Sequence, residues 1–266
     1  IAEERYSQNK EEKYFQAKKT MIDITPRLAQ MTGGEIDFPL KSAYFLTSGQ
    51  MAVEEDLFEM AKTYKEMFKK NEERYSQTYS NIRDKLEGLE QKIVMVPGNW
   101  NDLCFGKYFD GMNLHKQGPT EINGVEFIGY GSSYSIPNCT PEERFISFDE
   151  DEAFLYLSKH KEADVVLTHE VPKWCEGESN VPGNYALFSY VSRNQPSLVL
   201  SGHSHFPAFV RDSFSETYLI NPGNLGRYKD YDYGTFCELE LDDNLRVKPL
   251  KMYRINEGKL ITENLN

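Results

Sequence analysis

The sequence has few cysteines and no long apolar run. Four cysteines are present, widely spaced and without a Cys-x-x-Cys pair: Cys104, Cys139, Cys175 and Cys237. They are expected to be reduced thiols of a cytoplasmic protein. No apolar run approaches the roughly 18 residues that a membrane span requires, so no membrane partner is expected. The chain begins with Ile, and its polar opening stretch is unlike a signal peptide.

Positive charge is also scarce. Lys and Arg total 30 against 42 Asp and Glu, which gives a net charge of −12. This balance argues against nucleic-acid binding by counterion release, because such binding needs an excess of basic residues on one face. It would also repel anionic substrates, so a phosphate site would have to supply positive charge of its own, for instance as a metal ion. The sequence indicates no oligomeric state.

The residues that are present suffice for a layered domain. The 266 residues include 17 Tyr and 16 Phe, enough for a sizeable core. Composition and apolar spacing predict helices over 1–20, 53–90 and 152–160. Short apolar runs predict strands over 42–49, 92–99, 125–133, 163–170, 196–205, 216–224 and 234–243, with one more in the tail. Residues 21–39, which contain two Pro and two Gly, are expected to be mainly loop.

The order of these elements predicts the architecture. Strands alternate with helices at first and become consecutive near the end, which favours an α/β fold built as a mixed-sheet sandwich over an all-parallel doubly wound fold. We expect one domain over residues 1–266, with a helical enlargement at about 53–90.

Metal-binding residue types follow three of the predicted strands. Asn99 comes after VMVPG, His169 after VVLT, and His203 after LVLSG. Residues just past the ends of neighbouring strands meet at one edge of a sheet, where α/β proteins place their sites. His205 lies two residues beyond His203, so both side chains emerge on the same side of an extended segment and can serve two neighbouring ions. The other two histidines, in polar surroundings, are expected at the surface: His115 and His160.

Four blocks of sequence occur in an order that resembles a known family. They are PGNWND at 97–102, LTHEVP at 167–172, SGHSHFP at 201–207 and NPGNLGR at 221–227. Together they resemble the GNH(D/E), strand-His, GHxH and NPGS motifs of calcineurin-like metallophosphoesterases. The resemblance implies a two-layer mixed β-sandwich flanked by helices. It also implies hydrolysis of phosphate mono- or diesters by a metal-activated water.

The resemblance assigns residues to a metal centre. For one ion it implies a ligand set of Gln50, Asn99, His169 and His203, with Gln50 in place of the family's bridging Asp. For a second ion it implies His205. Asn99 and His203 are also the expected catalytic residues. This mixture of imidazole and amide donors suits Mn, Fe, Zn or Ni, with one or two ions per chain.

Two further residues are expected to contact the substrate. Trp100 stands where the family has the histidine that protonates or steadies the leaving group. Because an indole has no titrating proton to donate, substrates with good leaving groups are expected. Arg227, four residues after Gly223, lies close enough to reach a phosphate oxygen; an ordinary surface arginine is the alternative.

The sequence also departs from the family pattern. It contains no Asp-x-His, the family's N-terminal metal motif, and residues 23–25 are the nearest approach to it. A strand that ends in this motif is expected to precede Ile1, with residues 1–20 as the helix that follows. The main expectation is a metal-dependent phosphoesterase. The alternatives are a catalytically degenerate module of the same fold that acts as a protein-binding or scaffold subunit, and a zinc-site protein of another fold.

Overall fold

The computed structural model describes residues 2–98, 104–133, 146, 148–173, 183–205, 207–212, 216–224, 233–248, 250–256 and 259–265. Internal contacts divide the chain into two compact units. Unit 1 consists of Ile1–Gly88, Trp100–Tyr108 and Ser135–Ile146; unit 2 consists of Leu89–Asn99, Phe109–Tyr134 and Ser147–Asn266. The sequence predicts one domain with a helical enlargement, and that enlargement falls in unit 1. No described helix combines the length and apolar character that crossing a membrane requires.

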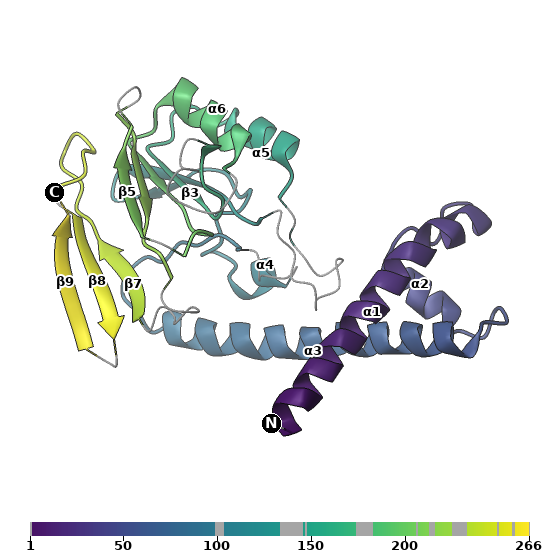
Figure 1. Cartoon of the computed structure of the whole chain (residues 1–266). Coiled ribbons are helices and arrows are strands. Elements are labelled where there is room, and N and C mark those ends of the chain that lie inside the picture. Colours follow the sequence, from purple (N-terminus) through teal and green to yellow (C-terminus); the bar gives the residue numbers. More distant parts are fainter. Residues whose placement is uncertain are drawn as a thin grey trace. The chain divides into compact units, whose positions relative to one another are not determined.

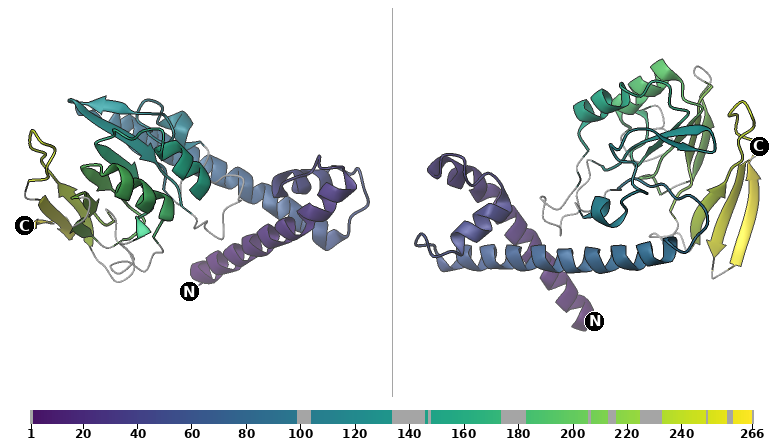
Figure 2. Two further views of the ribbon diagram at one scale, coloured as in Figure 1. Left: turned by 90° about the horizontal axis from the view of Figure 1, so that it is seen from above. Right: turned by 180° about the vertical axis from the view of Figure 1, so that it is seen from behind.

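Unit 1 is helical. Its described helices are α1 (Ala2–Met31), α2 (Pro39–Leu46), α3 (Glu55–Leu86) and α4 (Phe105–Tyr108). The helices α1, α2 and α3 pack on one another (Figures 1 and 2) around the side chains of Ala17, Met21, Leu28, Ile36, Ala43, Leu46, Ala61, Tyr64 and Met67. The short helix α4 lies against α3, where Phe105 and Tyr108 contact the ring of Tyr79. The helix predicted over 53–90 is confirmed as α3.

Two predictions for the N-terminal region are wrong. The loop expected over 21–39 is helical as far as Met31, because α1 continues through Pro26. The strand expected over 42–49 is helix α2, which has Pro39 in its first turn, where the missing N–H of proline costs no helical hydrogen bond. Ala43 and Leu46, three residues apart, are buried on its inner face.

Unit 2 contains a six-stranded sheet. Its strands are β1 (Thr120–Ile122), β2 (Val125–Tyr130), β3 (Val165–Thr168), β4 (Leu198–Leu200), β5 (Ala208–Arg211) and β6 (Tyr218–Asn221). They are ordered β1-β2-β3-β4-β6-β5; the four central strands β2, β3, β4 and β6 are parallel, and each edge strand is antiparallel to its neighbour. The strands predicted over 125–133, 163–170, 196–205 and 216–224 are confirmed. The segment predicted as a strand over 92–99 makes only an isolated bridge, between Met95 and Asn113.

A second sheet completes a sandwich. Strands β7 (Tyr233–Glu238), β8 (Leu250–Asn256) and β9 (Lys259–Leu265) form an antiparallel sheet. Leu250 and Met252 of β8 pack against Val165, Leu198 and Ile220 of the six-stranded sheet. The burial of this apolar surface holds the two sheets face to face.

Helices cover the other face of the six-stranded sheet (Figure 1). They are α5 (Glu150–Leu157) and α6 (Tyr185–Asn194). Each begins at a side-chain cap: Asp149 accepts a hydrogen bond from the Glu152 N–H, and Asn184 accepts one from the Leu187 N–H. Their buried residues pack on Ile128, Val166, Val199 and Leu219 of the sheet. The predicted fold class, a two-layer mixed α/β sandwich flanked by helices, is confirmed.

Candidate functional site

Two of the predicted site residues meet at the carboxyl edge of the six-stranded sheet. His169 directly follows β3, and His203 follows β4, its parallel neighbour. The Nε2 atom of His169 lies 3.1 Å from Nδ1 of His203, and the two rings are nearly perpendicular, at 89°. Because parallel neighbours end at the same edge, the topology of the sheet is what brings these imidazoles together. Their roles as ligands remain predictions.

The turn that carries His203 is tightly fixed. His203 has a left-handed backbone conformation (φ 59°), which costs energy for a residue with a Cβ atom and is common at functional sites. The side-chain amide of Asn221, at the end of β6, donates hydrogen bonds to the carbonyls of Gly202 and Ser204 at 2.8 and 2.9 Å. The Asn221 Oδ1 atom accepts from the Gly223 N–H at 2.9 Å. Asn221 is thus a site residue to which the sequence analysis gave no role, although it begins the NPGNLGR block.

Two glycines pack against the His169 ring. A Cβ atom at Gly98 would lie 2.9 Å from Cε1 of His169, and a Cβ atom at Gly202 would lie 3.0 Å from its Nδ1. Both positions therefore need a residue without a side chain if the ring is to stay where it is. The contact also brings the Pro97–Gly98 backbone, which leads to Asn99, up to the histidine pair. Three predicted site residues lie outside the described part of the chain: Asn99, Trp100 and Arg227.

The reason for placing Gln50 in the site, a strand directly before it, is wrong. Gln50 was predicted to follow a strand, but it follows helix α2 and the turn after it, and its side chain is exposed. Glu170, the residue after His169, is buried, at 1 % exposed.

The model of the calcineurin-like phosphoesterase family matches residues 62–207, more than half of the chain. The chain belongs to this family. The matched region contains the histidine pair and His205 but excludes Gln50. Among proteins of curated function, none matches this chain significantly.

Similar solved structures share little sequence with this chain. Wild-type Vps29 from Entamoeba histolytica, complexed with zinc, is 16 % identical, with 68 % of this chain and 73 % of that chain covered and a TM-score of 0.34. A predicted phosphoesterase from Streptococcus pneumoniae is 14 % identical, with 71 % and 91 % covered and a TM-score of 0.29. The Thermus thermophilus sulfate thiohydrolase SoxB, in complex with glycerol, is 14 % identical, with 68 % and 33 % covered and a TM-score of 0.35.

Burial keeps His169 and His203 neutral. It lowers the pKa of His169 to about 3, with smaller contributions from the neighbouring His203 and His205. Burial also lowers the pKa of His203. Neutral imidazoles have a nitrogen lone pair available, which is the form that binds a metal ion.

The histidine pair fits a divalent ion. Two nitrogens bound at about 2.1 Å to one ion would be about 3.0 Å apart in octahedral and about 3.4 Å apart in tetrahedral geometry, and the separation of 3.1 Å between His169 Nε2 and His203 Nδ1 lies between these values. Within the described residues, however, no three side chains of the His, Cys, Asp and Glu types lie close enough together to hold an ion. Any further ligand must therefore be an amide, a hydroxyl, a backbone group or a residue outside the described ranges.

Proposed function

We propose that this chain is a metal-dependent phosphoesterase that hydrolyses phosphate mono- or diesters at the His169–His203 pair. One observation carries the proposal: two neutral imidazoles converge at the carboxyl edge of the sheet, with their nitrogens 3.1 Å apart. Membership of the phosphoesterase family supports it. Mn, Fe, Zn or Ni is the proposed ion, at one or two per chain, in a protein of the cytoplasm.

The residues of the chain would act mainly by holding and orienting. His169 and His203 would bind one ion together with Asn99, and His205 would contribute to a second. Such an ion activates water for attack on phosphorus and offsets the charge on the phosphoryl oxygens. Gly98 and Gly202 fix the orientation of the His169 ring by packing against it.

The substrate would be held and selected by residues near this edge. Arg227 would donate hydrogen bonds to a phosphoryl oxygen, which guanidinium groups do well. Trp100 would lie beside the leaving group and could not protonate it. Esters of acidic alcohols, such as nitrophenyl esters, should therefore react faster than alkyl esters.

A degenerate binding module is the second candidate, and a specific observation favours it. Within the described residues the histidine pair has no carboxylate partner close enough to share an ion, and the sequence has no Asp-x-His. A shared carboxylate is the usual means of offsetting repulsion between two adjacent ions. On this alternative the fold would act as a protein-binding or scaffold subunit.

Metal analysis and a hydrolysis assay separate the two candidates. The full chain would be stripped with a chelator and reloaded in turn with Mn²⁺, Zn²⁺, Fe²⁺ and Ni²⁺. Bound metal would then be measured by mass spectrometry, and turnover with bis(p-nitrophenyl) phosphate. We expect near-stoichiometric metal and measurable hydrolysis. Retention of less than about 0.2 equivalents of every ion, with no hydrolysis, would favour the binding module.

Histidine variants locate the activity. His169→Ala and His203→Ala should each lower metal affinity and turnover by about a hundredfold or more, because each removes a proposed ligand. His160→Ala is the matched control, since its ring has a tilted contact with the ring of Tyr156 in α5, with centroids 4.9 Å apart. Equal losses in all three variants would contradict the placement of the site.

A further inference from the structure

Ser133 points its hydroxyl at the histidine pair. It lies three residues beyond β2, the strand next to β3, and its side chain is 1 % exposed. Its Oγ atom is 3.3 Å from Nδ1 of His203, the nitrogen that faces His169. Two ligands of one ion at about 2.1 Å would be about 3.0 Å apart in octahedral and about 3.4 Å apart in tetrahedral geometry. The Oγ–Nδ1 separation falls in this range, as the separation between the two imidazole nitrogens does.

The backbone before Ser133 has little freedom to move. A Cβ atom at Gly131 would lie 2.4 Å from the carbonyl oxygen of Pro97, so the two backbones are in close contact. The Ser132 N–H donates a hydrogen bond to the same oxygen. Ser132 itself has a left-handed backbone conformation (φ 87°) and no exposed surface. The segment 131–133 is therefore held against the loop that leads to Asn99.

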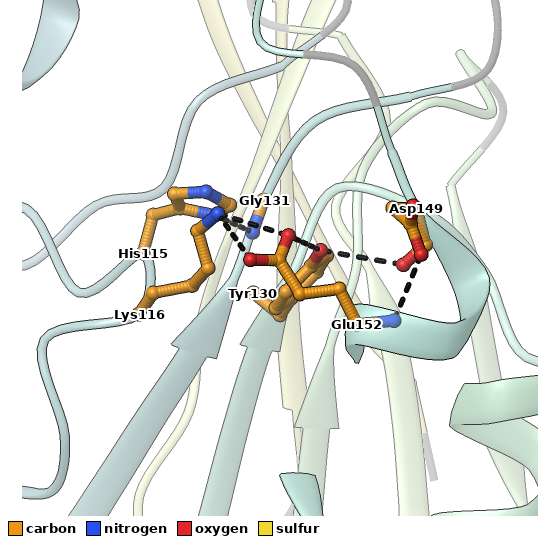
Figure 3. Close-up of polar contacts among 6 residues, drawn as sticks. All are labelled: His115, Lys116, Tyr130, Gly131, Asp149 and Glu152. Carbon is orange, nitrogen blue, oxygen red and sulfur yellow. Dashed lines mark hydrogen bonds and ion pairs between the residues drawn. The ribbon is translucent and has the colours of Figure 1, made fainter. Parts of the chain in front are cut away.

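A buried histidine holds the other side of this segment. His115 was expected at the surface but is only 8 % exposed. Its Nδ1 atom accepts a hydrogen bond from the Gly131 N–H at 3.0 Å (Figure 3), so this nitrogen carries no proton. The imidazole also packs against the ring of Tyr130, with ring centroids 5.0 Å apart.

The surroundings of His115 are anchored to helix α5. The Tyr130 hydroxyl donates to Glu152 at 2.9 Å and to the Asp149 carbonyl at 3.3 Å. The ammonium group of Lys116 donates to both carboxylate oxygens of Glu152 at 2.9 Å. Figure 3 shows these contacts as a group that joins Lys116 and Tyr130 to the start of α5, beside the separate hydrogen bond between His115 and Gly131. The imidazole that supports Gly131 therefore packs on a ring that is itself held by α5.

We infer that Ser133 supplies an oxygen donor to the ion at His169 and His203, and that His115 is the residue that positions Ser133. The inference rests on the proposed function and deepens it, because it adds a ligand that the family motifs do not contain. One hydroxyl beside two imidazoles gives a mixed N/O donor set of the kind that Mn, Fe, Zn and Ni accept. It also explains how a site poor in carboxylates binds its ion.

Cobalt spectroscopy tests the Ser133 donor. Ser133→Cys replaces the oxygen by sulfur, and a thiolate bound to Co²⁺ gives a charge-transfer absorption in the near ultraviolet. We expect this band when the full-length Ser133→Cys variant is titrated with Co²⁺, and no band in the wild type or in Ser132→Cys, the variant of the neighbouring buried serine. Cobalt bound by Ser133→Cys without the band would overturn the inference and leave the proposed function standing. A wild type that takes up no Co²⁺ would overturn both.

Affinity measurements test the positioning role of His115. His115→Leu keeps most of the volume but removes the acceptor for Gly131, whereas His115→Asn places Oδ1 where Nδ1 was. Competition with a chelator should show Co²⁺ affinity weakened about tenfold in Ser133→Ala and in folded His115→Leu, and close to wild type in His115→Asn. The double variant Ser133→Ala/His115→Leu should lose no more Co²⁺ affinity than the single variant that binds Co²⁺ less tightly, because both changes act through one hydroxyl. Additive losses, or a His115→Leu variant that binds as the wild type does, would overturn the positioning role.

Discussion

Asn221 should contribute more to the stability of unit 2 than any exposed asparagine does. It is 3 % exposed and makes three hydrogen bonds of 2.8 to 2.9 Å, two as donor and one as acceptor. At a net value of about 1 kcal/mol for each bond, Asn221→Ala should lower the free energy of unfolding by about 3 kcal/mol. The loss would be larger if the carbonyls of Gly202 and Ser204 were left buried without partners. The same change releases the turn that carries His203, so metal binding should weaken as well.

Denaturant unfolding of the full chain, followed by fluorescence and circular dichroism, measures this loss. Because the chain has two compact units, two transitions can occur, and only the transition of unit 2 should move. Asn194→Ala is the control, since the Asn194 amide makes one hydrogen bond, to the Tyr190 carbonyl at 2.9 Å. It should cost about 1 kcal/mol or less. An Asn221→Ala variant within about 0.5 kcal/mol of the wild type, or no worse than the control, would refute the reasoning.

Gly98→Ala should weaken Co²⁺ affinity about tenfold or more in a chelator competition, since the new methyl group would displace the His169 ring. Gly88→Ala, which has open space at its Cβ position, should bind Co²⁺ as the wild type does. Burial, with a smaller effect of Lys116, holds the pKa of His115 at about 4, below its ordinary 6.5, so its contribution to stability is complete above pH 6.5 and falls as the pH drops towards 4. Denaturation at a series of pH values should show that, between pH 6.5 and 4, the free energy of unfolding of His115→Asn falls by about 3 kcal/mol less than that of the wild type. Parallel pH profiles would contradict the lowered pKa of His115. Asp149→Ala should cost about 1 kcal/mol by removing the cap of α5, and Asp149→Asn should cost little, as measured by thermal unfolding.

The histidine pair could be predicted from the sequence because its placement follows from topology. His169 and His203 each follow a short apolar run, and such runs form the central parallel strands of an α/β sheet. Once β3 and β4 are neighbours, the residues beyond their ends share an edge whatever the detailed packing. The same reasoning could not find Asn221 or Ser133, because their contacts depend on the turns that follow the strands.

The wrong predictions concern residues whose structure depends on packing against distant parts of the chain rather than on local sequence. The run SAYFLTSG at 42–49 is apolar enough for a buried strand, but contacts with α1 and α3 make it helical. The expectation that Gln50 follows a strand was wrong for the same reason. The polar neighbours of His115 suggested a surface position, yet its backbone bridges to Gly129 and its ring is buried against Tyr130. Periodicity carries no information about such long-range contacts.

The boundary between the units has a practical consequence for dissecting this chain. A fragment that stops at Gly88 would retain all three long helices, yet it would lack Phe105 and Tyr108, whose rings cover Tyr79. That tyrosine, 3 % exposed in the intact chain, would then face water. Because unit 1 also includes a segment beyond Gly88, a single truncation does not separate the two units. A fragment that contains all of the described helices of unit 1 would need a new loop from the end of α3 to α4.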